Sequence, residues 1–232
     1  TEQGDGRLAA GKGVAVCMSK EEADSFLKEV FTDRRFGEGR LLVEEFLTGP
    51  EVSIFGALVD DHYLILCPAR DYKRLKEGDA GPNTGGMGVY SPVPIVTDEE
   101  HATMVEVMEQ TVAELAAEGI TYSGCLYGGF MLTKDGPKVL EFNARFGDPE
   151  TEAVLPRLGG DFATALLHAA TGCLKPGDVV VKDAYAATVI MASGGYPGSY
   201  EKGKVITGLE NNPALVFHCG TKMVDGRVVT AG

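Results

Sequence analysis

The chain has 232 residues, of which 34 are acidic and 21 basic, so its formal net charge is −13. The length suits one large domain or two small ones, and the acidic balance argues against a nucleic-acid or anionic-membrane partner. No apolar run is long enough for a membrane-spanning helix. The N-terminus has no apolar signal core, and the five cysteines form no CxxC pair, which fits a cytoplasmic location.

The first half of the chain alternates between helix and strand signals. Ser19 and Glu22 have capping-box spacing and predict a helix that continues to about residue 30. Residues 41–47 read as a strand, and residues 51–59 and 62–68 as a hairpin. Residues 71–94, rich in Gly, Pro, Asn and Asp, are expected to be one long functional loop.

The second half begins with a second capping box, Thr97 to Glu100, which predicts a helix to about Glu118. A hairpin is expected over 123–133 and 137–142, followed by a helical stretch over 150–171 with a weak point at two consecutive glycines. Beyond a boundary near residues 175–177 we expect short strands over 186–192, 205–209, 215–221 and 227–230. Both ends look cut, so we expect a piece of a longer protein.

The segment GRLAAGKG, residues 6–13, nearly matches a phosphate-binding P-loop. Gly13 stands where the motif needs the Ser or Thr hydroxyl that holds Mg²⁺, and a strand-like stretch follows where a P-loop opens a helix. Two readings stay open: a glycine-rich flap over phosphates with Lys12 as a point charge, and an ordinary turn.

Two glutamates, Glu44 and Glu51, lie seven residues apart around an apolar stretch. They suit the amine of an adenine ring and the hydroxyls of a ribose, because carboxylates accept hydrogen bonds from both. Isolated glutamates more often lie on a solvated edge, and that alternative stays open.

The strongest candidate is the segment VLEFNAR, residues 139–145. Alternate side chains of a strand point to the same face, so Glu141, Asn143 and Arg145 are expected to project together. A carboxylate and an amide oxygen are hard ligands for Mg²⁺, and a guanidinium binds phosphate or carboxylate oxygens. The alternative is the ordinary polar face of a half-exposed strand.

Positive charge gathers in the expected long loop, at Arg70, Lys73, Arg74 and Lys76, and the glycine-rich stretch 81–88 follows. Basic side chains beside a glycine-rich backbone can receive an anionic substrate. The alternative is a loop with solvated charges. The stretch GGYPG, residues 194–198, reads only as a turn.

Five stretches together resemble the glycinamide ribonucleotide synthetases of the ATP-grasp superfamily: LAAGKGV (8–14), VEEFLTGPEVS (43–53), GPNTGGMGVYSPVP (81–94), VLEFNARFGDPE (139–150) and ASGGYPG (192–198). They cover almost the whole chain in the family's order. The resemblance implies an α+β ATP-grasp fold with a lid subdomain over 1–47, a core subdomain over 48–174 and a truncated β-rich C-terminal domain over 175–232.

The resemblance also implies a reaction and its ligands. ATP, glycine and 5-phosphoribosylamine would give glycinamide ribonucleotide, ADP and phosphate through a glycyl phosphate, with Mg²⁺ or Mn²⁺. The partners would be these small molecules, the enzyme's own N-terminal domain and, in organisms where the genes are fused, other purine enzymes. Two alternatives stay open: a non-catalytic nucleotide-binding fragment, and another ATP-grasp carboxylate–amine ligase.

The roles that the resemblance implies fall into four groups. Metal would be held by Glu141 and Asn143. ATP would be bound by Gly11, Lys12, Gly13, Glu44, Glu45, Phe46, Leu47 and Glu51. Arg145, Asp71 and Lys73 would be catalytic, and the substrates would meet Arg74, Asn83, Thr84, Gly85, Gly86 and Asp148.

Three departures from the family accompany the resemblance. The place of a phosphate-binding lysine holds Gly4. The place of a further metal carboxylate holds Gly128 and Gly129, so the site would hold its metal with fewer protein ligands. The family's N-terminal domain and the end of its C-terminal domain are absent from these residues.

Overall fold

A computed structural model describes residues 15–35, 37, 41–59 and 62–232. The chain divides into two compact units, Thr1–Leu47 and Thr48–Gly232, and each is described by itself. The predicted division at residues 174 and 175 stays a prediction. Among the described residues no helix is both long enough and apolar enough to cross a membrane.

The described part of the first unit contains one helix, α1 (Lys20–Leu27), which runs on into a π-helical turn, Lys28–Thr32. The predicted cap forms: the Ser19 side chain accepts a hydrogen bond from the Glu22 N–H. The Glu22 carboxylate reaches back to the N–H of Met18, one residue before the cap. The expected strand over 41–47 is wrong, because that segment pairs with no strand among the described residues.

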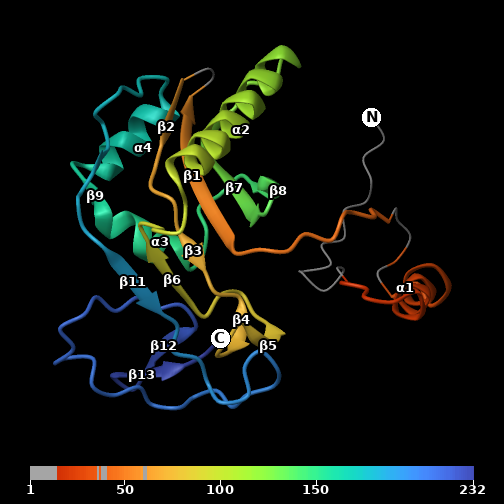
Figure 1. Ribbon diagram of the computed structural model, residues 1–232. Helices are drawn as coiled ribbons and strands as arrows, with labels where there is room; N and C mark the ends of the chain where they lie inside the picture. The colour runs from red at the N-terminus through yellow and green to blue at the C-terminus, as the bar shows by residue number, and fades with distance from the viewer. Residues whose placement is uncertain (1–14, 36, 38–40, 60–61) are drawn as a thin grey trace. The chain divides into compact units, whose positions relative to one another are not determined.

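The second unit is built around a four-stranded antiparallel sheet in the order β2-β1-β7-β8 (Figure 1). Both predicted hairpins are confirmed. The strands are β1 (Glu51–Val59), β2 (His62–Ile65), β7 (Ser123–Thr133) and β8 (Gly136–Asn143). β2 ends three residues before the predicted Pro68.

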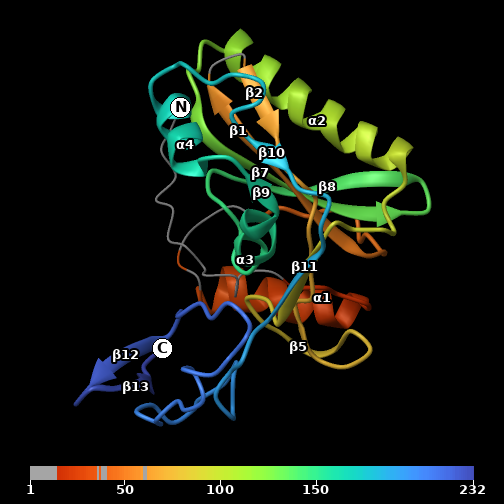
Figure 2. The same ribbon diagram turned by 90° about the vertical axis from the view of Figure 1, so that its left-hand side faces the viewer.

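Helix α2 (Asp98–Ala117) lies along one face of this sheet (Figure 2). Its predicted capping box is present in both directions, between Thr97 and Glu100. Its buried positions, Met104, Met108 and Val112, recur every fourth residue and pack with Ile54 and Phe130 of the sheet. The strand alternation therefore sends even-numbered β7 residues such as Phe130 toward α2, and odd-numbered residues away from it.

The opposite face of the sheet is covered by α3 (Glu150–Val154) and α4 (Phe162–Ala170). The prediction of a single helical stretch over 150–171 is wrong for the middle of that range. A 3₁₀ turn, Leu155–Arg157, and a short strand, β9 (Leu158–Gly159), interrupt it. Pro156 removes a backbone donor and Gly160 has φ +86°, so neither suits a continuous helix.

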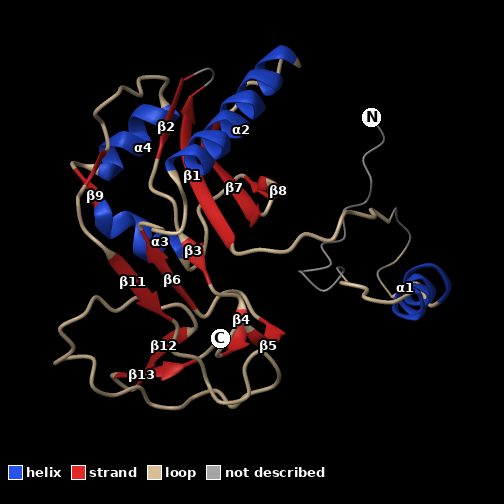
Figure 3. Cartoon of the chain, viewed as in Figure 1, coloured by secondary structure: helices blue, strands red, loops and turns tan. Residues whose placement is uncertain are grey.

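The expected long loop over 71–94 is wrong, because short strands occupy much of it (Figure 3). β4 (Arg74–Lys76) and β5 (Ala80–Asn83) form a hairpin whose turn has positive φ at both Gly78 and Asp79. β3 (Arg70–Asp71) and β6 (Gly88–Ser91) join a strand from far along the chain, β11 (Ala186–Val189), in the order β11-β6-β3. Such distant pairing leaves no local sequence signal.

The chain after α4 is tied to the core before it forms its own hairpin. β10 (Val180–Val181) pairs with β9, and β11 pairs with β6. The last hairpin consists of β12 (Thr221–Val224) and β13 (Arg227–Thr230). Strands were expected over 205–209 and 215–221. The first range forms only a bridge from Val205 to Val229, and the second contributes only Thr221.

Candidate functional site

The two residues predicted to bind metal project from the sheet face opposite α2. β8 pairs with β7 in the register Gly129↔Glu141 and Tyr127↔Asn143, and directly opposed residues in an antiparallel pair share a face. Gly128 marks the other face, since a Cβ atom there would lie 2.7 Å from the Met108 sulfur of α2. The strand alternation predicted for Glu141 and Asn143 is therefore confirmed.

A glycine opposite Glu141 leaves space for its side chain. A Cβ at Gly129 would lie 3.3 Å both from Glu141 Cγ and from the Tyr127 ring, which is tighter than an ordinary contact. Glu141 itself is exposed, and Asn143 is partly buried with no partner for Nδ2 among the described residues. A carboxylate and an amide on one face are donors that fit a hard divalent cation.

Arg145 lies beyond the end of the strand that was expected to carry it. β8 stops at Asn143, so the alternation of side chains does not extend to residue 145. The Arg145 guanidinium carbon instead lies 5.9 Å from the centre of the Tyr127 ring, and Nη1 donates to the Phe146 carbonyl oxygen at 3.1 Å. Since Tyr127 pairs with Asn143, these contacts still bring the cation to the same end of the sheet.

The predicted residues Glu51, Asp71 and Lys73 form an ionic cluster. Lys73 Nζ lies 3.1 Å from a Glu51 oxygen and 3.8 Å from an Asp71 oxygen. Glu51 pairs with Met131, two residues along β7 from Gly129, so it shares the face of Glu141. The Glu51 carboxylate is already ion-paired with Lys73, and a ribose would have to share it.

Asp71 is the buried member of this cluster. Its side chain is 4% exposed, and neither of its oxygens has a hydrogen-bond partner among the described residues. Burial raises the pKa of Asp71 to about 7; Lys73 opposes the shift, and Glu150 and Glu51 add to it. Burial alone would lower the pKa of Lys73, but Glu51 and Asp71 hold it above its usual value. The cluster therefore keeps Lys73 protonated and lets Asp71 change charge near neutral pH.

Glu150, which the sequence analysis assigned no role, is buried beneath the same face with 3% exposure. One of its oxygens accepts hydrogen bonds from Tyr127 at 3.1 Å and from Ser53 at 3.3 Å. Burial and the neighbouring Glu150 carboxylate both raise the pKa of Tyr127, so the phenol remains a donor. Gly147 is required nearby, because a Cβ there would lie 2.5 Å from Glu150. In the sequence, the only indication of this role for Glu150 is that an acidic residue directly follows the FGDP turn.

The remaining predicted substrate residues lie on the β4–β5 hairpin and in the loop that follows it. Arg74 and Asn83 are exposed and directly opposed in the hairpin, and Arg74 Nη1 donates to the Gly81 carbonyl oxygen at 2.9 Å. Gly86 has φ +133°, and a Cβ there would lie 2.7 Å from one Asp71 oxygen and 2.3 Å from Pro149. Only glycine can therefore lie this close to the buried carboxylate.

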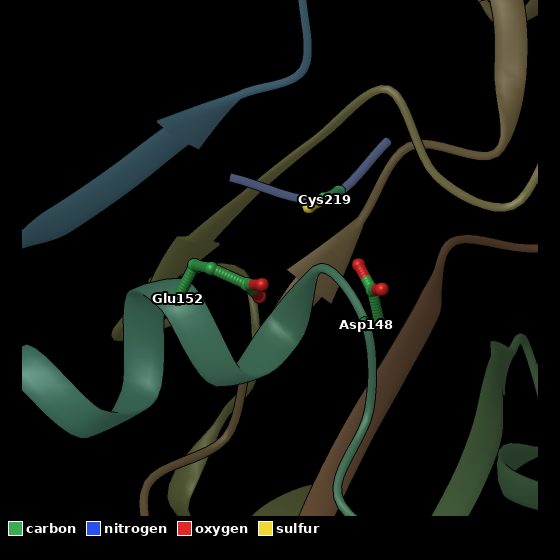
Figure 4. A group of neighbouring side chains, drawn as sticks. All are labelled: Asp148, Glu152 and Cys219. Carbon is green, nitrogen blue, oxygen red and sulfur yellow. The ribbon is translucent and has the colours of Figure 1, made fainter. Parts of the chain in front are cut away.

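Asp148 is exposed and lies in a different group of side chains. Figure 4 shows it beside Glu152 of α3 and Cys219 of the C-terminal segment, whose donor atoms all lie within 4.8 Å of one another. Partial burial, Asp148 and Glu152 raise the pKa of the Cys219 thiol. Asp148 and Cys219 are exposed, and exposed acidic groups often lie close together without an ion, so we assign no metal to these three side chains.

The other predicted nucleotide residues belong to the first unit. Gly11, Lys12 and Gly13 lie outside the described residues. Residues 44–47, the run from Glu44 through Glu45 and Phe46 to Leu47, have no regular secondary structure. Of the predicted residues that are described, the structure thus brings together Glu141, Asn143, Arg145, Glu51, Asp71, Lys73 and Gly86, all in the second unit.

Two family models match this chain. Residues 4–151 match the phosphoribosylglycinamide synthetase ATP-grasp (A) domain, and residues 186–232 match the C domain of the same family. The second unit carries the mixed helices and antiparallel sheets of that fold, so the expected α+β ATP-grasp class is confirmed.

Individual relatives agree with these models. The chain is 46% identical to phosphoribosylamine–glycine ligase of Escherichia coli O6:H1 (strain CFT073) and 44% identical to that of Pseudomonas aeruginosa, over 97% of its own length and 54% of theirs. It is 47% identical to the trifunctional purine biosynthetic protein adenosine-3 of Gallus gallus, of which it covers 23%. The chain thus spans about half the length of the bacterial relatives.

Among solved structures, the phosphoribosylamine–glycine ligase of Thermotoga maritima matches with a TM-score of 0.85 and 37% identity, over 97% of this chain and 57% of that one. A biotin carboxylase from Campylobacter jejuni matches with a TM-score of 0.60 at 15% identity, which indicates a shared fold alone; it covers 90% of this chain and 47% of that one. The chain therefore belongs to the phosphoribosylglycinamide synthetase family and contains its ATP-grasp domain.

Proposed function

We propose that this chain is the nucleotide-binding and acyl-phosphate-forming part of a phosphoribosylamine–glycine ligase. The observation that carries the proposal is the 46% identity to a ligase of that name over 97% of the chain. The geometry supports it, because Glu51, Glu141 and Asn143 share one sheet face. Lys73 lies 3.1 Å from Glu51 on that face, and Arg145 lies over the Tyr127 ring. This grouping of two cations in an acidic protein supports binding of a polyanionic substrate at this face.

In the proposed reaction a carboxylate oxygen of glycine attacks the γ-phosphorus of ATP, and ADP leaves. The amine of 5-phosphoribosylamine then attacks the acyl carbon of the glycyl phosphate, a proton leaves the nitrogen, and phosphate departs. No protein nucleophile is needed, so the side chains act by positioning and charge neutralisation. Lys73 and Arg145 would hold the anionic groups, and Asp71, whose oxygens are covered, would act by keeping Lys73 in place.

Glu141 and Asn143 would hold a divalent ion, Mg²⁺ or Mn²⁺, through their side-chain oxygens. Such an ion supplies charge neutralisation across the phosphates of ATP. Among the described residues Glu141 is the single carboxylate on β8, and the glycine opposite it adds no ligand. Residues 9–13 and 44–47 of the first unit would add the phosphate flap and the adenine contacts, while Arg74, Asn83, Thr84, Gly85 and Asp148 would face the other substrates.

A second candidate is a nucleotide-binding piece that turns nothing over. The observation that favours it is the coverage of only 54% of the bacterial ligases. The ligation of 5-phosphoribosylamine, the fusion to other purine enzymes and the cytoplasmic location all depend on the whole protein and stay proposals.

A phosphate-release assay on this chain separates the candidates. We expect release with ATP and Mg²⁺ to require glycine, because the glycyl phosphate forms from its carboxylate, and the assay is run with and without 5-phosphoribosylamine. Phosphate release that requires bicarbonate or another amino acid in place of glycine would indicate a different carboxylate–amine ligase. ATP binding without any release would support the non-catalytic candidate.

A further inference from the structure

The GGYPG stretch, which reads as a turn in the sequence, contacts the glycine loop of the core. β11 runs alongside β6, and one residue later Ile190 donates to the Met87 carbonyl oxygen at 3.0 Å. The chain then turns, with Tyr196 N–H bonded to the Ser193 carbonyl oxygen at 3.1 Å. This turn directs the Tyr196 hydroxyl to the N–H of Gly85, 3.1 Å away.

The backbone amides of the loop over residues 84–87 are all occupied within the protein. Three of the four acceptors lie within residues 72–84. Thr84 N–H donates to Lys73 O at 2.7 Å, and Met87 N–H donates to Tyr72 O at 2.8 Å. Gly86 N–H donates to Thr84 Oγ1 at 3.1 Å. The fourth, for Gly85, is a side chain 111 residues away. The loop therefore offers no free amide to an anion over these four residues, contrary to the expectation from its glycines.

The absence of a side chain at Gly86 instead allows the loop backbone to lie close to its neighbours. Gly86 packs against the Asp71 carboxylate and Pro149, and Asp71 lies next to Lys73. A displacement of the loop would uncover Asp71 and loosen Lys73, because the loop bonds to the carbonyl of Lys73 through Thr84. The loop's conformation and the position of the Lys73 ammonium are thus coupled.

We propose that Tyr196 is a positioning residue that fixes the 84–87 loop over Asp71 and Lys73 for binding of the carboxylate substrate. This inference rests on the proposed function. Lys73 is the half-buried cation next to the loop, and its side chain is 35% exposed. Because a cation attracts an anionic group, we infer that Lys73 binds the carboxylate of glycine. Tyr196 acts through the Gly85 amide and does not contact the reacting atoms.

The test compares Tyr196→Phe with the matched control Tyr200→Phe, a phenol four residues away on the same segment that makes ring contacts with Tyr196 and Lys202. Amide exchange of Gly85 is followed by NMR on the substrate-free protein, and KM and kcat are measured for each substrate. We expect Tyr196→Phe to speed Gly85 exchange and to raise KM for glycine about 3- to 10-fold, the usual worth of one neutral hydrogen bond.

The same variant should leave kcat, KM for ATP and the melting temperature nearly unchanged, and Tyr200→Phe should change nothing. Unchanged Gly85 exchange in Tyr196→Phe overturns the inference whatever the activity. Faster exchange with an unchanged KM for glycine, or an equal rise in KM for ATP, overturns the positioning role. Absence of turnover in the wild-type protein contradicts the proposed function instead, and Gly85 exchange still decides whether Tyr196 holds the loop.

Discussion

The sheet face of β1, β7 and β8 and the glycine loop above β3 assemble in different ways. On the sheet, neighbouring strands set the positions of Glu141, which is exposed, and Asn143, which is partly buried. At the loop, a tyrosine from the C-terminal segment, a buried aspartate and a tightly packed glycine meet from distant parts of the chain. Local alternation is thus enough to place side chains on a sheet, whereas the conformation of a loop depends on long-range contacts.

The largest expected effect falls on the loop. Gly86→Ala places a methyl group 2.3 Å from Pro149 Cδ and 2.7 Å from an Asp71 oxygen, at φ +133°. We expect the free energy of unfolding in urea to fall by about 3 kcal/mol. Gly78→Ala is the matched control, since its φ is also positive but nothing lies within 4 Å, and it should cost about 1 kcal/mol. Equal losses in the two variants would show that loop packing is unimportant.

The buried Asp71 gives the loop a dependence on pH. With its pKa raised to about 7, the folded protein keeps a proton that the unfolded chain loses above about pH 4. The stability contributed by protonated Asp71 is therefore lost as pH rises from about 4 to 7. Lys73, Glu51 and Glu150 are the charged groups that face it.

Asp71→Asn should remove this dependence. Relative to the variant, the wild-type protein should lose on the order of 2 kcal/mol of unfolding free energy between about pH 4 and 8. Urea unfolding at a series of pH values measures the difference. A constant difference between the two proteins would mean that Asp71 is ionised throughout the range.

The smallest expected change in stability falls on the sheet. Gly129→Ala brings a methyl group 3.3 Å from both Glu141 Cγ and the Tyr127 ring. The exposed Glu141 side chain can move aside, and the ring has to shift only by a few tenths of an ångström. We expect less than about 1 kcal/mol of destabilisation but about tenfold weaker binding of ATP with Mg²⁺, measured by calorimetry. Large destabilisation with unchanged binding would reverse the contrast between the sheet and the loop.

Where local patterns decide, the sequence predicts well: the helix caps at Ser19 and Thr97, both hairpins and the shared face of Glu141 and Asn143 follow from side-chain spacing. Of the two predicted capping boxes, only the one between Thr97 and Glu100 forms in both directions. Arg145 does not continue that pattern, because the strand ends first. Of the strands within 70–91, β6 pairs with residues 186–189 and β3 pairs with β6. Glu150 and Tyr196 gain their roles from partners far along the chain, and no local signal carries such information.

We propose above all that Glu141 and Asn143 form the metal–nucleotide end of this sheet. The most direct test is calorimetric titration of ATP into three proteins: the wild-type chain, Glu141→Ala, and the control Glu114→Ala on the exposed surface of α2. Each titration is run once in Mg²⁺ and once in a chelator. We predict at least about tenfold weaker binding for Glu141→Ala in Mg²⁺, no difference in chelator, and wild-type affinity for Glu114→Ala. Equal affinity of wild-type protein and Glu141→Ala in Mg²⁺ would contradict the account.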